Sequence, residues 1–174
     1  MTEPPPPAPK LRVPPLTPPF RIVLVEPEIP PNTGSIARTC GATSTPLHLV
    51  GKLGFRLDEQ SIRRAGLDYW HLVEVTQHEA LVDFERAHPA ARLHYFSGDA
   101  ERSYLEAPFA PGDALVFGKE SVGLPRALLD ANPERVWGIP MSGGVRSLNL
   151  SNAVSVVLFE ALRQAGALGP TFRG

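Results

Sequence analysis

The chain has 174 residues, of which 43% are hydrophobic and 20% charged, so it can close one sizeable core but hardly two. Its 17 Lys and Arg nearly balance its 18 Asp and Glu, and the net charge of -1 excludes a uniformly basic nucleic-acid coat protein. A single cysteine, Cys40, excludes an intramolecular disulfide framework and fits a reducing cytoplasm.

Proline is concentrated at the start of the chain, where nine of the 20 prolines fall within residues 1–20. Proline has no backbone N–H and holds the chain near polyproline II, so we expect a disordered tail over residues 1–20. This tail is either a linker or a Pro-x-x-Pro docking element. One catalytic domain is predicted over residues 21–166 and a flexible tail over residues 167–174.

Short apolar runs alternate with helical stretches along the rest of the chain. Their pattern predicts strands over residues 21–25, 47–50, 72–75, 92–96, 114–117 and 135–139. Helices are predicted over residues 33–41, 59–64, 78–87, 125–131 and 147–165. The caps expected for the first three helices are Asn32, Asp58 and a capping box of Thr76 with Glu79. This alternation is typical of an α/β fold with a mainly parallel sheet, helices on both of its faces and ligands at the carboxyl ends of its strands.

The longest predicted helix, residues 147–165, carries apolar side chains at spacings of three and four. They are Leu150, Val154, Val157, Leu158, Ala161 and Leu162. Such spacing places the side chains on one buried stripe. The stripe faces the sheet, a partner subunit, or both.

Several classes of protein are disfavoured by missing patterns. No Gly-x-Gly-x-x-Gly run occurs, and Gly118-Lys119 lacks the glycine spacing of a phosphate loop, so we expect neither a dinucleotide-binding protein nor an NTPase. The five histidines are scattered without ligand spacing, so we expect no metal. No apolar run approaches the roughly 18 residues of a membrane span, and no secretory signal is evident, so we expect a cytoplasmic protein without a membrane partner.

Three loops that follow predicted strands are rich in glycine and polar residues. Residues 26–38 contain a proline-rich turn, then Asn32 and Arg38. Residues 117–125 place Gly118 at a strand end, where a glycine permits close approach of a ligand. Residues 139–152 crowd polar side chains, among them Asn149, around the start of the last helix, more than capping alone explains.

Together these loops resemble the three motifs of the SPOUT class of S-adenosylmethionine-dependent RNA methyltransferases. The motifs are Asn-x-Gly-x-x-x-Arg at residues 32–38, Gly-x-Glu-x-x-Gly-Leu at 118–124 and Ser-x-Asn-x-Ser at 147–151. Within the class, the chain is similar over residues 21–166 to small bacterial enzymes that methylate the ribose 2'-hydroxyl of nucleotide 34 in tRNA. The narrower likeness is carried by VEPEIPPNTGSIART, IRRAGLDYW and IPM followed by RSLNLSNAVSVVLFEA.

The resemblance implies a C-terminal trefoil knot, a homodimer and S-adenosyl-L-methionine as cofactor. By position, the cofactor contacts would be Phe96, Gly118, Ile139 and Ser147. Arg38 would activate the 2'-hydroxyl, and Asn32, Glu120 and Asn149 would shape the same pocket. Because a guanidinium is a poor base at neutral pH, Arg38 would alternatively bind a phosphate or stabilise the developing alkoxide.

A local basic cluster is the candidate contact with the anticodon stem-loop of tRNA. Lys52, Arg56, Arg63 and Arg64 precede Tyr69 and Trp70, two aromatic residues that either stack on bases or belong to the core. The target implied by the resemblance is cytidine or modified uridine 34 of leucine tRNAs. The alternatives are another tRNA or rRNA position, or a non-catalytic RNA-binding protein.

Overall fold

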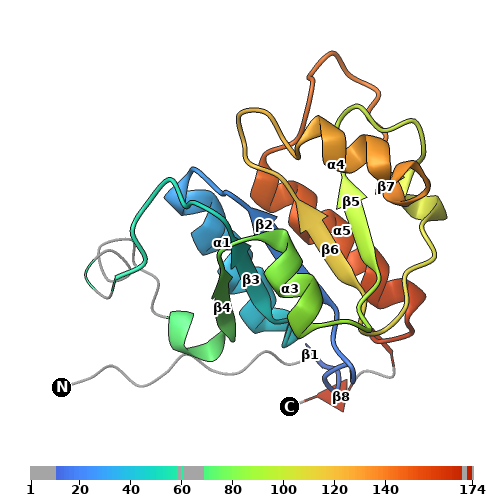
Figure 1. Ribbon diagram of the computed structural model, residues 1–174. Coiled ribbons are helices and arrows are strands. Elements are labelled where there is room, and N and C mark those ends of the chain that lie inside the picture. Colours follow the sequence, from blue (N-terminus) through green and yellow to red (C-terminus); the bar gives the residue numbers. More distant parts are fainter. Residues whose placement is uncertain (1–10, 59, 61–68, 170–171, 174) are drawn as a thin grey trace.

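The computed structural model describes residues 11–58, 60, 69–169 and 172–173. Its centre is a six-stranded sheet in the order β4-β3-β2-β6-β5-β7 (Figure 1). The pairings of neighbouring strands in this sheet are parallel, which confirms the predicted α/β class with its parallel sheet. The strands are β2 (Arg21–Val25), β3 (Leu47–Val50), β4 (Val75–His78), β5 (Leu93–Phe96), β6 (Ala114–Phe117) and β7 (Val136–Trp137).

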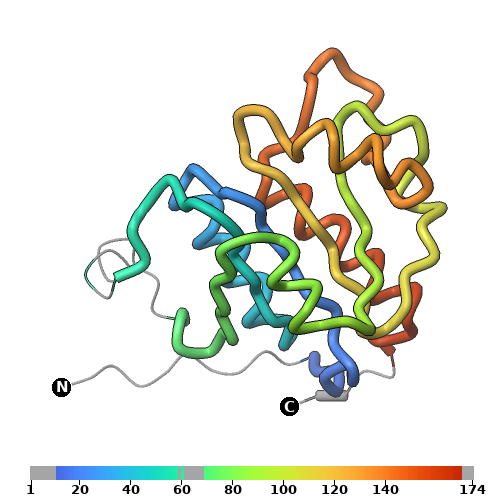
Figure 2. Tube along the Cα trace, in the orientation of Figure 1, coloured from blue at the N-terminus to red at the C-terminus, as the bar shows by residue number. Residues whose placement is uncertain are grey.

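Helices cover both faces of the sheet, as predicted (Figures 1 and 2). Helices α1 (Pro30–Thr43) and α5 (Leu150–Gln164) pack over one face, against Ile22 and Leu24 of β2. Helices α3 (Leu81–Ala87) and α4 (Arg126–Ala131) lie on the other, where Val23 points. Because successive strand side chains point to opposite faces, β2 contributes to both cores.

The predicted strand over residues 72–75 is wrong. Residues Trp70–Leu72 form a 3-10 helix, η1, and the strand starts at Val75. β4 lies at the edge of the sheet and buries little, so its apolar pattern is weak. Helix α3 consequently begins at Leu81, and the Ala80 N–H donates to Asp83 Oδ2 (3.0 Å) in place of the predicted Thr76–Glu79 box.

The starts of the two helices that carry the first and third motifs also differ from the prediction. Helix α1 begins at Pro30, not after an Asn32 cap, since proline fits a first helical turn whose N–H groups have no partner within the helix. Helix α5 begins at Leu150 with Asn149 as its N-cap, so Ser147 lies before the helix. The apolar stripe of α5 faces the sheet, since it is buried at Val154, Val157, Leu158, Ala161 and Leu162.

The remaining elements are short. They are the 3-10 helices η2 (Tyr104–Glu106) and η3 (Pro133–Arg135), and β1 (Leu11–Arg12), which pairs antiparallel with β8 (Phe172–Arg173). This last pairing joins segments that the sequence assigns to the two tails. The predicted helix over residues 59–64 lies outside the described residues, apart from Gln60. In the described part of the chain, no helix is long and apolar enough to cross a membrane.

A buried polar chain fastens β7 to the sheet. Trp137 Nε1 donates to His94 Nδ1 (3.1 Å), and His94 Nε2 lies 2.8 Å from Asp113 Oδ2. Burial opposes ionisation of Asp113, but hydrogen bonds from His94, the Ala110 N–H and Arg92 outweigh it and lower the pKa of this carboxyl. These hydrogen bonds hold β7 in place, and Ile139 lies two residues after that strand.

A second buried histidine, His48, should make the free energy of unfolding depend on pH. His48 of β3 lies beside His78 (Nδ1 to Nε2, 3.0 Å) and His88 (ring centroids 5.0 Å). Burial, and then the charges of His88, His78 and Arg21, lower the pKa of His48 to about 3. The unfolded chain therefore binds more protons between about pH 6.5 and 3, and stability is lost as pH falls through that window. From pH 6.5 to 5, we expect urea titrations to show a loss of roughly 2 kcal/mol.

His48→Leu should flatten this dependence, whereas His71→Gln, at an exposed residue of η1, should not. An unchanged slope in His48→Leu would contradict the assignment.

Candidate active site

The first two motif loops meet at the carboxyl edge of the sheet. Strand β2 leads to β3 and β4 on one side and pairs with β6 on the other, so the strand order reverses between β2 and β6. Open parallel α/β sheets bind ligands outside the carboxyl ends of their strands at such a reversal. The loop after β2 carries residues 26–29, and the loop after β6 carries residues 118–125.

Two carboxylates join these loops reciprocally. Glu28 accepts hydrogen bonds from the N–H and the hydroxyl of Ser121 (both 3.0 Å), and these bonds lower the pKa of the Glu28 carboxyl. Glu120 in turn accepts from the N–H groups of Glu28 (2.8 Å) and Ile29 (3.1 Å). The ion pair of Lys119 Nζ with Glu26 Oε2 (3.4 Å) adds a third tie. The two loops therefore hold each other in place.

Glu120 bonds to the residues that lead into α1, although it lies in a distant part of the chain. Its carboxylate accepts from the N–H groups of the two residues before Pro30, and there it places negative charge near the positive end of the helix dipole. Its Oε1 further accepts from Nδ2 of Asn32 (3.3 Å). With three donors on one carboxylate, Glu120 is suited to orient its neighbours rather than to accept a proton.

Asn32 connects the starts of both motif helices. Its side chain is buried, and its Oδ1 accepts from Nδ2 of Asn149 (2.9 Å). Asn149 caps α5 by accepting from the N–H (2.9 Å) and the hydroxyl (2.6 Å) of Ser151. The structure thus brings together Glu120, Asn32 and Asn149, three of the four residues predicted to act in catalysis, in one hydrogen-bonded chain.

Arg38, the fourth residue predicted to act in catalysis, lies farther along α1 and forms none of these hydrogen bonds. Its side chain is exposed, and its guanidinium carbon lies 5.5 Å from the centroid of the Tyr69 ring. Arg38 therefore presents a cation to solvent two turns into α1. The thiol of Cys40 on the same helix is no candidate nucleophile, because burial raises its pKa to about 12.

Three of the four predicted cofactor residues end or follow neighbouring strands. Phe96 ends β5, Gly118 follows β6 and Ile139 follows β7 by two residues. The Phe96 ring stacks in the core on Phe117 (centroids 4.7 Å apart, planes 14° apart), so a ligand would meet the main chain of Phe96. At Gly118 a Cβ would lie 2.1 Å from the carbonyl carbon of Gly123, so only glycine fits this turn.

Ser147, the fourth, lies in an exposed loop that joins β7 to α5. This loop, orange-red in Figure 2, rises above the carboxyl ends of β5 and β6. A Cβ on Gly98, two residues beyond β5, would lie 3.8 Å from the carbonyl oxygen of Arg146. The loop therefore runs beside the end of β5, and all four predicted residues belong to one edge of the sheet.

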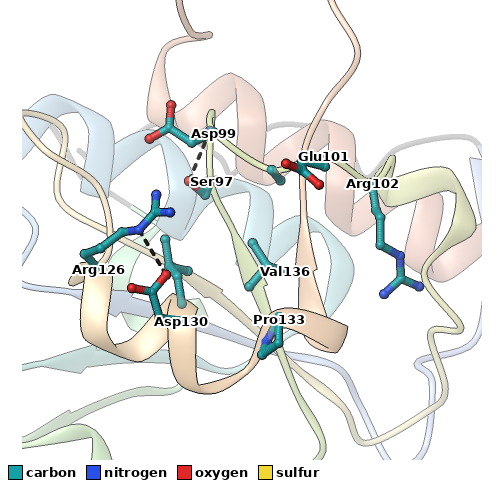
Figure 3. A pocket seen from close by; sticks show the side chains of 10 residues that line it. Ser97, Asp99, Glu101, Arg102, Arg126, Asp130, Pro133 and Val136 are labelled. Atoms are coloured by element: carbon teal, nitrogen blue, oxygen red, sulfur yellow. Dashed lines mark hydrogen bonds and ion pairs between the residues drawn. The ribbon is translucent and has the colours of Figure 1, made fainter.

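A pocket of about 280 Å³ near this edge is not predicted by any sequence motif (Figure 3). It lies between residues 97–102, helix α4 and Val136, and Arg126 pairs with Asp130 at its rim (3.0 Å). None of the predicted site residues lines it. Half of its lining residues are charged, and they come from short elements that carry no distinctive spacing.

The predicted RNA-binding cluster is described only in part. Lys52 and Arg56 are exposed, and Arg56 pairs with Asp58 (3.2 Å), whereas Arg63 and Arg64 lie outside the described residues. Tyr69 and Trp70 are half-buried and pack against the core. Of the two interpretations of these aromatic residues, the structure favours the core.

An open α/β fold with a tight glycine turn and two polar helix starts at one edge is typical of enzymes that bind a small cofactor there. Residues 19–159 match the SpoU rRNA Methylase family, and the chain belongs to it. A tRNA (cytidine(34)-2'-O)-methyltransferase of Burkholderia pseudomallei is 49% identical over 154 residues, which cover 86% of this chain and 98% of that one.

Solved structures agree with this assignment. One, described as "Structural insights into the 2-OH methylation of C/U34 on tRNA", is 47% identical with a TM-score of 0.77, over 83% of this chain and 95% of that one. An AdoMet-bound rRNA methyltransferase from Sinorhizobium meliloti is 25% identical with a TM-score of 0.70, over 83% of this chain and 56% of that one. The family that the motifs resemble is thereby confirmed.

Proposed function

We propose that this protein methylates the ribose 2'-hydroxyl of nucleotide 34 of tRNA, cytidine or modified uridine, with S-adenosyl-L-methionine as methyl donor. The observation that carries the proposal is the 49% identity, along nearly the whole length, to a tRNA (cytidine(34)-2'-O)-methyltransferase. The hydrogen bond between Asn32 and Asn149, which joins the starts of the two motif helices, supports the same proposal. Leucine tRNAs are the narrower target, and the cytoplasm is the compartment we assign.

The carboxyl ends of β5, β6 and β7 suit the cofactor. Phe96, Gly118 and Ile139 would hold it chiefly through main-chain amides and carbonyls, and the loop with Ser147 would close over it. The glycine turn supports this fit, because the absence of a Cβ lets residues 118 and 123 approach closely. When bound, S-adenosylmethionine supplies a methyl group on a positively charged sulfur.

The protein's own residues orient the hydroxyl and stabilise the charge that develops on it. With S-adenosylmethionine bound, the ribose oxygen would take the methyl group, the neutral thioether S-adenosylhomocysteine would leave, and the hydroxyl proton would pass to solvent water. Alignment lowers the entropic part of the barrier. A guanidinium is a poor general base, so the role proposed for Arg38 is to bind the developing alkoxide or the adjacent phosphate. Glu120, Asn32 and Asn149 hold the start of α1 in the position that this role requires.

Calorimetry with S-adenosylmethionine tests the cofactor directly. The expected result is saturable binding that Gly118→Ala weakens. A chain that binds tRNA but takes up no S-adenosylmethionine would instead be a non-catalytic RNA-binding protein, and the proposal would fail.

A homodimer and a C-terminal trefoil knot belong to the proposal and are supported by family membership. The solvent side of α5 carries exposed Val156 (39%) and Phe159 (46%), and Leu148 (39%) precedes the helix. Apolar side chains grouped in this way are typical of an interface between subunits. Sedimentation as a monomer at micromolar concentration would contradict the dimer.

Binding of the anticodon stem-loop should weaken steeply with salt despite the net charge of -1. Exposed cations such as Arg38 and Lys52 would neutralise phosphates, and each neutralised phosphate releases counterions. Between 50 and 200 mM KCl we expect the affinity to fall at least about tenfold in fluorescence anisotropy. Lys52→Gln should reduce the slope, and Arg126→Gln on α4 should leave it unchanged. A flat salt response would rule out the basic patch.

Methylation of ribosomal RNA is the second candidate function. The family description and the AdoMet-bound rRNA methyltransferase from Sinorhizobium meliloti favour it. A preference for rRNA fragments over tRNA in competition assays would decide for this alternative.

A further inference from the structure

Tyr69 lies along the face of α1 that carries Arg38. Its hydroxyl donates to the carbonyl oxygen of Gly34 (2.9 Å), and its ring lies under the guanidinium of Arg38, 5.5 Å from centroid to carbon. Residues 34 and 38 are four positions apart and therefore share one side of the helix. One aromatic side chain thus contacts the helix at two points, one turn apart.

The segment that follows Tyr69 is seated on the same side of α1. Gly41, seven positions after Gly34, is approached so closely by Val73 that a Cβ there would lie 3.2 Å from Val73 Cγ2. The 3-10 helix η1 lies between these contacts and packs against α1. Tyr69 is therefore held by its hydroxyl and by the packing of the residues behind it.

We propose that Tyr69 is a positioning residue that holds the Arg38 guanidinium ready for the 2'-hydroxyl. The inference rests on the role proposed for Arg38 above. A long arginine side chain has many rotamers, and ordering it costs entropy at the moment of reaction. An aromatic ring attracts the cation and restricts its orientation before substrate arrives.

The kind of contact matters for this role. A cation–π contact attracts the guanidinium to the face of the ring without a hydrogen-bond acceptor, so the N–H donors of Arg38 are left for oxygen atoms. A carboxylate partner in the same place would occupy those donors and neutralise the charge. A tyrosine therefore restricts the orientation of Arg38 and leaves its N–H donors available to the hydroxyl or a phosphate.

The test uses Tyr69→Leu, which removes the ring, and Tyr69→Phe, which keeps it. We expect Tyr69→Leu to lower kcat roughly fivefold with KM for tRNA within about twofold, and Tyr69→Phe to restore kcat to within about twofold of wild type. In an Arg38→Gln background, assayed in single turnover, Tyr69→Leu should cause no further loss. Leu72→Ala, an exposed neighbour on η1, is the matched control.

NMR of the arginine side chains detects the contact between Arg38 and Tyr69 independently of enzyme activity. In the wild type, the Arg38 Nε–H signal, assigned by its loss in Arg38→Gln, should be shifted upfield by the ring, and Tyr69→Leu should abolish that shift. Retention of the shift in Tyr69→Leu would overturn the inference even if tRNA proves not to be the substrate.

Two kinetic outcomes would overturn it as well. One is wild-type kcat in Tyr69→Leu while Arg38→Gln is inactive. The other is an equal loss from Tyr69→Leu in both backgrounds, because the ring would then act independently of Arg38. Wild-type kcat in Arg38→Gln would remove the role proposed for Arg38, and the inference with it.

Discussion

Arg38→Gln is expected to lower kcat roughly a hundredfold, the usual cost of removing a group that stabilises transition-state charge. The loss should fall on kcat rather than on the affinity for S-adenosylmethionine, because Arg38 lies on α1 while the predicted cofactor residues follow β5, β6 and β7. Single-turnover methylation with excess enzyme measures the chemical step, and calorimetry measures cofactor binding.

Arg126→Gln is the matched control, because Arg126 is an exposed arginine on α4 that pairs with Asp130. It should keep wild-type turnover. If Arg38→Gln also did so on a competent tRNA, no catalytic role would remain for Arg38. Arg38→Lys separates charge from geometry, since lysine keeps the cation but loses the planar fork of donors.

Gly118→Ala is expected to disrupt both cofactor binding and stability. The added Cβ would lie 2.1 Å from the carbonyl carbon of Gly123 and 2.2 Å from the nitrogen of Leu124, distances that force the main chain to move. Overpacking at a buried position costs about 1–3 kcal/mol. We therefore expect a lower midpoint of thermal unfolding together with at least about a tenfold weaker affinity for S-adenosylmethionine.

Gly169→Ala provides the control, because a Cβ at Gly169 meets nothing within 4 Å. It should leave both measurements unchanged. Wild-type affinity in Gly118→Ala would show that the turn after β6 does not shape the cofactor site.

The central strands could be predicted from the sequence because a strand that is buried on both faces shows its burial in its own residues. Every residue of β3, β5 and β6 is buried, so each appears as a short, mainly apolar run, which is interrupted only by His48 in β3 and His94 in β5. The edge strand β4 lacks that signal, and the apolar run 72–75 ahead of it carries a stronger one. Asn32 lies inside helix α1 and bonds to Glu120, 88 positions away, which local patterns do not reveal.

The sequence indicates which residues belong to the candidate site, but not how their side chains are arranged. Asn32, Glu120 and Asn149 were named through the motif resemblance, whereas their order in one hydrogen-bonded chain follows from the pairing of β2 with β6. Tyr69 was singled out as an aromatic residue for RNA stacking, and its contacts with Gly34 and Arg38 depend on how η1 packs on α1. Contacts of this kind are fixed by tertiary structure.

Methylation of the ribose of nucleotide 34 in tRNA is the activity on which the other predictions depend. The most direct test is incubation with S-adenosylmethionine carrying a labelled methyl group and total undermodified tRNA, followed by nuclease mapping of the labelled nucleotide. We expect label on the 2'-oxygen of nucleotide 34, and we expect Arg38→Gln to abolish it. Label on a base, at another nucleotide, or only on ribosomal RNA would contradict this expectation.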